Sequence, residues 1–218
     1  MSIPDLSADR GRALALTPVS RETTARLNQF VALLLQWQDV THLIAPSTVP
    51  RLWTRHIADS LQLIDLAPDA KIWVDLGTGG GFPGLVIACA LYGMAGRMVH
   101  LVESNTKKAA FLRAAVAATG SPAVVHAVRM EKFVESFAGR TDIVTARAVS
   151  PLSLLLGQCL PLLKQGAVGL FLKGQDVEAE LTEASRCWKM AADLVPSRTD
   201  PKARIVMIRA LEPRPSCH

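Results

Sequence analysis

The stretch Trp73-Val74-Asp75-Leu76-Gly77-Thr78-Gly79-Gly80-Gly81-Phe82-Pro83-Gly84 decides the fold of this chain, because an apolar strand runs there into a turn dense in glycine. Glycine adopts positive φ without strain and carries no Cβ, so such a turn can bring the backbone close to a ligand. Pro83 has a fixed φ and no N–H, which suits the first turn of a following helix. The stretch therefore predicts a strand, a ligand-binding turn and a helix in succession.

Three glycine-rich patterns can be compared with this turn. The dinucleotide pattern G-x-G-x-x-G, started at Gly77, requires glycine where Phe82 stands. The P-loop pattern, started at Gly79, requires Lys and then Ser or Thr after its second glycine, and two apolar residues stand there. The third pattern, Asp-x-Gly-x-Gly-x-Gly from Asp75 to Gly81, fits the sequence. It resembles the first motif of the S-adenosylmethionine-dependent methyltransferases.

This resemblance implies that the chain binds S-adenosyl-L-methionine through Asp75, Gly77, Gly79 and Gly81. A carboxylate at the end of the strand, Asp75, can meet the cationic amino acid portion of that cofactor. The alternative is a glycine-rich turn that binds no ligand. Clustered glycines, however, destabilise a fold unless the backbone needs their freedom.

Composition and charge limit the class of protein to which this chain can belong. The chain has 218 residues, half of them apolar, which is enough for one α/β domain with an extension. The net charge is +5, and the excess lies in residues 71–218, which hold eighteen Lys and Arg against twelve Asp and Glu. A basic domain of this kind suits a polyanionic partner such as RNA. An arginine-rich genome composition is the alternative explanation.

The apolar pattern changes near residue 70. Residues 18–38 and a second segment from about residue 47 carry apolar residues every three or four positions, which predicts helices. From residue 71 onward, expected strands alternate with helices, and the strands are 72–76, 98–103, 124–128, 143–146 and 168–172, followed by a terminal pair at 191–196 and 204–210.

We therefore expect an α/β fold, a doubly wound, Rossmann-like methyltransferase fold with a mostly parallel sheet and an antiparallel C-terminal strand. A helical N-terminal extension, residues 1–70, is expected to pack on the cofactor-binding core, residues 71–218.

Ligands of an open α/β sheet bind at the carboxyl ends of its strands. Glu103 closes the second expected strand, where a carboxylate can accept hydrogen bonds from both ribose hydroxyls, although a carboxylate that only stabilises the start of a helix is the alternative. Arg147 follows the fourth strand and could pair with the cofactor carboxylate, hold a guanine, or form an ion pair with Asp75 or Glu131. Lys173 ends the fifth strand, and a substrate phosphate is its expected partner.

One helix face of the extension carries three polar residues, His56, Asp59 and Ser60, three or four positions apart. They could form a polar cluster that contacts the core or RNA. A hydrogen-bonded structural role for His56, joining the extension to the core, is the favoured interpretation.

Four separated motifs carry a resemblance to a specific family. They are Arg55-His56-Ile57-Ala58-Asp59-Ser60-Leu61, the stretch from Asp75 to Gly84, Ala146-Arg147-Ala148 and Leu172-Lys173-Gly174-Gln175. In this order they resemble the glucose-inhibited division B or RsmG family of small-subunit ribosomal RNA methyltransferases, which methylate a guanine at N7. The resemblance spans about residues 30–210.

The resemblance implies that Gly77, Phe82, Met130, Glu131 and Arg147 line the cofactor pocket. It also implies a substrate in the decoding-region loop of 16S ribosomal RNA, as naked RNA or within the small ribosomal subunit. One departure stands at His42-Leu43-Ile44, where the family often has Asn-Leu-Thr. Any role of that Asn is therefore in doubt for this chain.

The expected chemistry needs no general base, because guanine N7 has an available lone pair and only orientation is required. Arg147 and Lys173 are accordingly expected to orient the substrate. A methyltransferase of small molecules and a non-catalytic, RNA-binding ribosome assembly factor stay open as alternatives.

No histidine pair has metal-ligand spacing, and no apolar run is long enough to span a membrane, so we expect neither a metal nor a membrane partner. The four cysteines have no paired spacing, which indicates reduced thiols and a cytoplasmic location. We expect a monomer.

Overall fold

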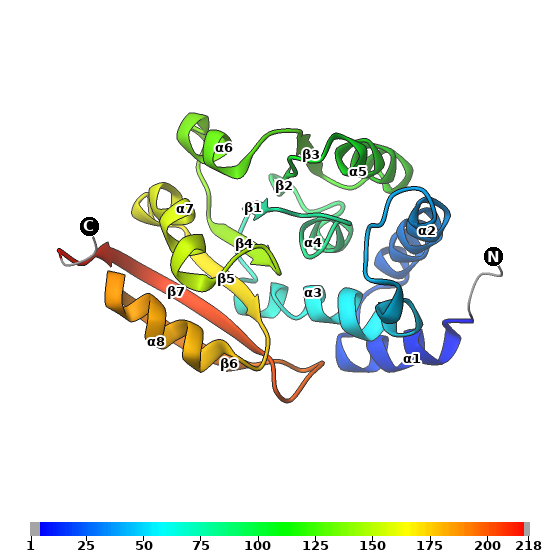
Figure 1. The fold of residues 1–218 in the computed structure, drawn as a ribbon. Coiled ribbons are helices and arrows are strands. Elements are labelled where there is room, and N and C mark those ends of the chain that lie inside the picture. Colours follow the sequence, from blue (N-terminus) through cyan, green and yellow to red (C-terminus); the bar gives the residue numbers. More distant parts are fainter. Residues whose placement is uncertain (1–4, 216–218) are drawn as a thin grey trace.

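One seven-stranded sheet organises residues 5–215, which are the residues that the computed structural model describes (Figure 1). The strands are β1 (Ile72–Leu76), β2 (Met98–Val102), β3 (Ala123–His126), β4 (Ile143–Arg147), β5 (Val168–Lys173), β6 (Trp188–Pro196) and β7 (Arg204–Pro213). Their spatial order is β3-β2-β1-β4-β5-β7-β6. Strands β1 to β5 are parallel, and β7 runs antiparallel between β5 and β6. The predicted fold is confirmed.

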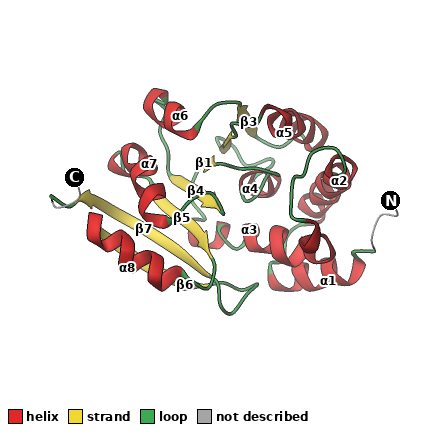
Figure 2. Cartoon of the chain, viewed as in Figure 1, coloured by secondary structure: helices red, strands yellow, loops and turns green. Residues whose placement is uncertain are grey.

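Helices cover both faces of this sheet, as Figure 2 shows. Those of the core are α4 (Gly84–Ala90), α5 (Thr106–Thr119), α6 (Met130–Ser136), α7 (Leu152–Lys164) and α8 (Val177–Cys187). Local signals set their ends. The Asn105 side chain caps α5 by accepting from the N–H groups of Lys107 and Lys108, and Gly120 ends the helix at φ +62°.

Helix α6 was not predicted, and the third strand ends at His126 rather than near residue 128. Met130 and Glu131 therefore open a helix and do not form an extended turn. The seven-residue helix gives too short an apolar pattern to recognise in the sequence, although Phe133 and Val134 of that helix are buried.

The N-terminal part is helical but more irregular than expected. Its elements are α1 (Ser7–Leu16), α2 (Arg21–Gln38), η1 (Pro46–Arg51), η2 (Trp53–Ala58), α3 (Asp59–Leu61) and η3 (Ile64–Leu66). The single helix expected from about residue 47 is wrong, because a 3₁₀ turn containing Pro50 is followed by a π-helical turn at Trp53–Ala58.

Helix α1 was also not predicted, and one buried carboxylate explains its position. Asp9 accepts hydrogen bonds from the N–H of Trp53 at 2.8 Å, the N–H of Thr54 at 3.2 Å and the Thr54 hydroxyl at 2.7 Å. The carboxylate therefore caps the π-helical turn from a helix more than forty residues away in the sequence.

Two apolar clusters form the core on the two faces of the sheet. One cluster joins Leu27 and Phe30 of α2 to Trp73 of β1, Leu85 of α4 and Phe111 of α5. The N-terminal helices and the sheet thus share one continuous apolar interior, in which burial of each large side chain contributes roughly 1.5–3 kcal/mol.

The cysteines differ from the expectation in part. Cys89 and Cys159 are buried free thiols, as predicted. Cys187 is disulfide-bonded, so the prediction of a reduced thiol is wrong there. Cys217 lies outside the described residues.

Candidate active site

The glycine turn follows β1 and requires glycine for two reasons. Gly77 and Gly79 have φ values of +69° and +55°, which L side chains rarely adopt. A Cβ on Gly77 would also lie 2.8 Å from the Val149 side chain. The N–H groups of Gly77 and Thr78 both donate to the carbonyl of Val102 at the end of β2, which fixes the turn across the sheet.

Asp75 lies beneath the turn, fully buried. Its Oδ2 accepts from the N–H of Gly84 and its Oδ1 accepts from the Thr145 hydroxyl, each at 2.8 Å. Burial raises the pKa of Asp75 to about 6, and these hydrogen bonds oppose the shift. The carboxylate holds the first turn of α4 against β4. It does not line the cavity described next, so its predicted contact with the cofactor has no support in the geometry.

A cavity of about 470 Å³ lies where β1, β2 and β4 end, on the carboxyl side of the parallel strands. It lies within the range of roughly 300–1,000 Å³ typical of small-molecule sites. The structure brings six of the predicted residues to its wall: Gly77, Gly79, Phe82, Glu103, Met130 and Arg147. Four predicted residues lie elsewhere: Asp75, Gly81, Glu131 and Lys173.

The cavity has two walls of different origin. We call its lining residues between 77 and 149 the sheet wall. The other lining residues form the extension wall, which consists of Leu43, Ile44, Ala45, Thr48, Arg55 and His56. Apart from the polar cluster at His56, sequence reasoning did not identify the extension wall, because its members lie in a loop and in short irregular helical turns.

The two walls touch at Gly80. A Cβ built there would lie 2.8 Å from the backbone oxygen of Leu43, so only glycine permits this approach. The Gln38 side chain holds the facing loop, because its Oε1 accepts from the N–H groups of Leu43 and Ile44 at 3.1 Å and its Nε2 donates to the Ile44 carbonyl at 2.7 Å. The available signal of this contact was Gly80 itself, a glycine at a position where the motif Asp-x-Gly-x-Gly-x-Gly requires none. The solvent-exposed His42 does not line the cavity.

Glu103 is placed at the end of β2, as predicted. Its Oε2 accepts from the N–H of Gly79 at 2.9 Å and its Oε1 accepts from the N–H of Asn105 at 2.7 Å. A carboxylate can accept about four hydrogen bonds, so each oxygen retains capacity for a ligand hydroxyl. The helix-start contact given as the alternative is present as well, and the two roles are compatible.

Arg147 extends from the end of β4 to the extension wall. Its Nη1 donates to the Arg55 carbonyl at 3.1 Å and its Nη2 lies 2.6 Å from Nδ1 of His56. Its ion pair is with Asp59, at 3.7 Å, and not with Asp75 or Glu131. The guanidinium carbon lies 5.2 Å from the centre of the Phe82 ring. Arg147 thus links the core to the polar cluster that the sequence indicated.

His56 is buried and contacts two residues of the sheet wall, Arg147 and Phe82. Its ring centre lies 4.9 Å from that of Phe82, and its Nε2 lies 2.9 Å from the Thr48 hydroxyl. Burial first, and then the charges of Arg147 and Arg55, lower the pKa of His56 to about 3. The imidazole is therefore neutral at physiological pH.

A second cavity, of about 570 Å³, adjoins the first and shares Arg55, Arg147, Ala148 and Val149 with it. Ala148, at the junction, has φ +54°, and such strained positions occur preferentially at functional sites. Lys173 lines this second cavity. Its Nζ donates to Oε2 of Glu180 at 2.7 Å and to the Ser150 carbonyl at 2.8 Å.

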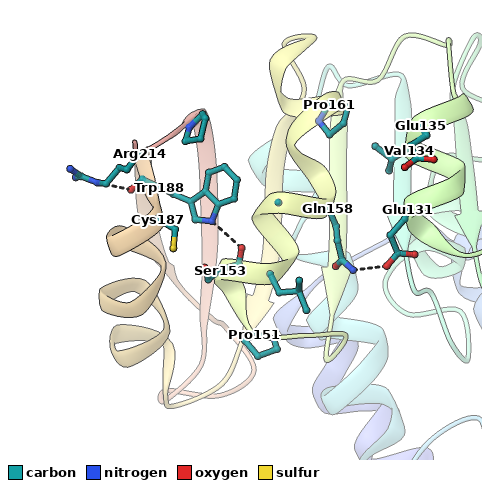
Figure 3. Close-up of a pocket in the computed structure, with 13 residues that line it drawn as sticks. Glu131, Val134, Glu135, Pro151, Ser153, Gln158, Pro161, Cys187, Trp188 and Arg214 are labelled. Carbon is teal, nitrogen blue, oxygen red and sulfur yellow. Dashed lines mark hydrogen bonds between the residues drawn. The ribbon is translucent and has the colours of Figure 1, made fainter. Parts of the chain in front are cut away.

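Glu131 and Gly81 do not line the first cavity. Glu131 accepts from the Gln158 side chain at 2.7 Å, and the two side chains face each other (Figure 3). They border a third cavity of about 690 Å³, which is lined by α6, α7, the start of β6 and the end of β7. Met130, the neighbour of Glu131, lines the first cavity, because successive helical residues point in different directions. Gly81 packs against Phe30 and has φ +95°, so its glycine serves the fold.

Within residues 5–215, no group of His, Cys, Asp and Glu side chains could hold a metal ion. In the same part of the chain, none of the helices has the length and apolar character to cross a membrane.

The chain matches the family model described as rRNA small subunit methyltransferase G over residues 23–207. It belongs to that family. A protein of Bradyrhizobium sp. strain BTAi1 named ribosomal RNA small subunit methyltransferase G is 60% identical over 95% of this chain and 93% of its own length. A protein of the same name from Rhodopseudomonas palustris strain BisB18 is 59% identical, covering 97% of this chain and 90% of its own.

Solved structures share the fold of this family member at low sequence identity. The cofactor-bound structure of Rv0187 from MTB has a TM-score of 0.60 and 16% identity, covering 96% of this chain and 99% of its own. The O-methyltransferase from Bacillus cereus in complex with SAH has a TM-score of 0.60 and 12% identity, covering 96% and 100%. The Rossmann-like methyltransferase fold is therefore the one predicted from the sequence. The methyl donor of the family, S-adenosyl-L-methionine, is likewise the predicted cofactor.

Proposed function

We propose that this protein transfers a methyl group from S-adenosyl-L-methionine to N7 of a guanine in the decoding-region loop of 16S ribosomal RNA. The observation that carries the proposal is the pair of adjoining cavities that share Arg147 and Ala148. One cavity suits the cofactor, and the other is large enough for an RNA base. Membership of the small-subunit rRNA methyltransferase G family supports the class of substrate.

The first cavity fits the cofactor by the chemistry of its lining. The turn at Gly77 and Gly79 admits a ligand next to the backbone, and Glu103 retains acceptor capacity for ribose hydroxyls. Arg147 is a cation suited to a carboxylate, and Met130 offers an apolar surface to adenine. When bound, the cofactor supplies an activated methyl group on a cationic sulfur.

The second cavity suits a nucleobase attached to a polyanion. Its wall carries the cations Arg55, Arg147 and Lys173 together with the carboxylates of Asp59, Asp176 and Glu180. Lys173 is held by Glu180, so it stabilises the wall and leaves less charge for a substrate phosphate than the sequence alone indicated. The basic balance of residues 71–218 supports RNA as the partner.

The residues at the cavities suit a reaction that needs no general base. His56 is neutral, with Arg147 at Nδ1 and Thr48 at Nε2, and Glu103 is engaged with backbone N–H groups. Guanine N7 has a lone pair available without loss of a proton. The contribution of this chain is therefore to orient two ligands in neighbouring cavities and to exclude water from them. We expect the protein to work as a monomer in the cytoplasm.

Methyl transfer to defined RNA tests the proposal. Purified protein, cofactor with a labelled methyl group, and either undermethylated 16S RNA or small subunits lacking the modification are combined, and the modified position is mapped. Label at N7 of one guanine in the decoding-region loop is the expected result. Arg147→Ala serves as the control for a site-dependent reaction. The absence of transfer over a range of salt and magnesium concentrations, or label on another base, contradicts the proposal.

A further inference from the structure

The Arg147 guanidinium is held by three groups from one short segment of the extension. Nη1 donates to the Arg55 carbonyl at 3.1 Å, Nη2 contacts His56 at 2.6 Å, and Asp59 lies 3.7 Å away. Asp59 is shared with other partners, since its Oδ1 accepts from the Thr199 hydroxyl at 2.7 Å. The contact with His56, at 2.6 Å, is the shortest of the three, and it is directed at Nη2.

The roles of the two imidazole nitrogens follow from the chemistry of arginine. A guanidinium carries donors and no acceptor, so Nδ1 of His56 must accept from Nη2 of Arg147. Nε2 then carries the proton and donates to the Thr48 hydroxyl. The charged groups facing the ring are Arg55, Arg147 and Asp59, and protonation would place a second donor against Nη2.

We infer that His56 is a positioning residue that fixes the Arg147 guanidinium over the Phe82 ring, at the wall shared by both cavities. This inference rests on the proposed role of Arg147 in binding the cofactor. The ring of His56 packs against Phe82 while its Nδ1 accepts from Nη2, so this one side chain contacts both the guanidinium and the ring beside which the guanidinium lies. The π-helical turn Trp53–Ala58 supplies His56 and the Arg55 carbonyl together, and π turns are frequent at functional sites.

A comparison of amide variants separates positioning from packing. Asn places its carbonyl oxygen close to the position of Nδ1, whereas Gln places its amide one bond further out. His56→Asn and His56→Gln therefore differ in acceptor position and share their chemistry. His56→Leu removes the acceptor, and Arg147→Ala removes its partner. The dissociation constant of S-adenosyl-L-methionine is measured by titration calorimetry for each variant and for the double variant His56→Leu with Arg147→Ala, and the thermal midpoint of each is recorded.

We expect His56→Leu to weaken cofactor binding by roughly tenfold or more, because a hydrogen bond to a charged group is lost. His56→Asn is expected to stay within about threefold of the wild type, and His56→Gln to bind more weakly than His56→Asn. In the Arg147→Ala background, His56→Leu should have no further effect, since His56 acts through that arginine. An equal weakening by His56→Leu in both backgrounds overturns the inference.

The design covers poor folding and failure of the proposed function. If His56→Leu does not fold, the Asn and Gln pair decides, and equal affinities of these two folded variants overturn the inference. All readouts use cofactor alone. A wild-type protein that binds cofactor and methylates no RNA would contradict the proposed substrate while leaving the role of His56 to be decided by the affinities.

Discussion

The two walls of the cofactor cavity differ in how the chain builds them. The sheet wall comes from the ends of regular strands, where backbone hydrogen bonds across β1, β2 and β4 fix each side chain. The extension wall comes from a loop and short helical turns, held by the side chains of Gln38 and Asp9. One ligand site thus combines a wall set by secondary structure with a wall set by a few side-chain hydrogen bonds.

The strongest way to break the sheet wall is Gly79→Val. At φ +55° a β-branched residue is strongly disfavoured, and its side chain would project where the turn lines the cavity. We expect cofactor binding to fall below detection in calorimetry. The nearest atom to a Cβ at this position is 3.8 Å away, so the fold is kept, with a loss of about 1–2 kcal/mol. Unchanged cofactor affinity would remove this turn from the site.

The corresponding change behind the extension wall is Asp9→Ala. It leaves the N–H groups of Trp53 and Thr54 without their buried acceptor. We expect the free energy of unfolding to fall by about 3 kcal/mol, since several hydrogen bonds to a charged group are lost. Chemical denaturation measures the change. The matched control is Asp39→Ala, an exposed aspartate, with an expected effect within about 0.5 kcal/mol. Equal effects of the two substitutions would contradict the capping role of Asp9.

Asp75→Asn tests the carboxylate beneath the sheet wall through the pH dependence of stability. Because burial raises the pKa of Asp75 from 3.8 to about 6, the native state prefers the protonated form. The stabilising contribution is therefore fully present below pH 3.8 and is lost as the pH rises through about 6. Its size is about 2–3 kcal/mol. Asn cannot titrate, so relative to the wild type the variant should gain stability between pH 4 and pH 7.

The measurement is the free energy of unfolding of both proteins at several pH values in that window. Other groups also make stability depend on pH there. His56 is one of them, because its pKa is lowered from 6.5 to about 3 in the native state, so only the difference between the two proteins reports on Asp75. A difference that does not change with pH would show that Asp75 is charged at no net disadvantage in the native state.

Gly80→Ala acts where the two walls meet. The added methyl group would lie 2.8 Å from the Leu43 oxygen, so the extension wall must shift. We expect the cofactor dissociation constant to rise roughly tenfold. Gly11→Ala, in helix α1 with nothing within 4 Å of its Cβ, is the control and should leave binding unchanged. A Gly80→Ala protein with wild-type affinity would indicate that the walls move independently.

Prediction from the sequence succeeded where a pattern repeats or where a motif is local. The alternation of strands and helices gave the sheet, and the glycine turn, Glu103 and Arg147 were found because strand ends meet at one edge. Asp75 lies at the end of the strand as predicted, but its carboxylate faces the N–H of Gly84, a contact that its position in the sequence alone cannot reveal.

The missed features depend on contacts distant in the sequence. Helix α1 has no strong apolar stripe, and its position depends on Asp9 reaching Trp53. The side chain of Glu131 faces Gln158 because residue 131 belongs to a short helix that was expected to be a turn. Lys173 was expected to be free for substrate, and its partner Glu180 lies on a helix whose orientation the sequence did not reveal.

The apolar cluster shared by α2 and the sheet has a consequence for synthesis of the chain. Translation releases the N-terminal residues first, but Leu27 and Phe30 pack against Leu85 and Phe111, which are made much later. Leu27 and Phe30 of α2 cannot complete this cluster until at least residue 111 has left the ribosome. The first third of this protein must therefore wait for the second before it acquires its native environment.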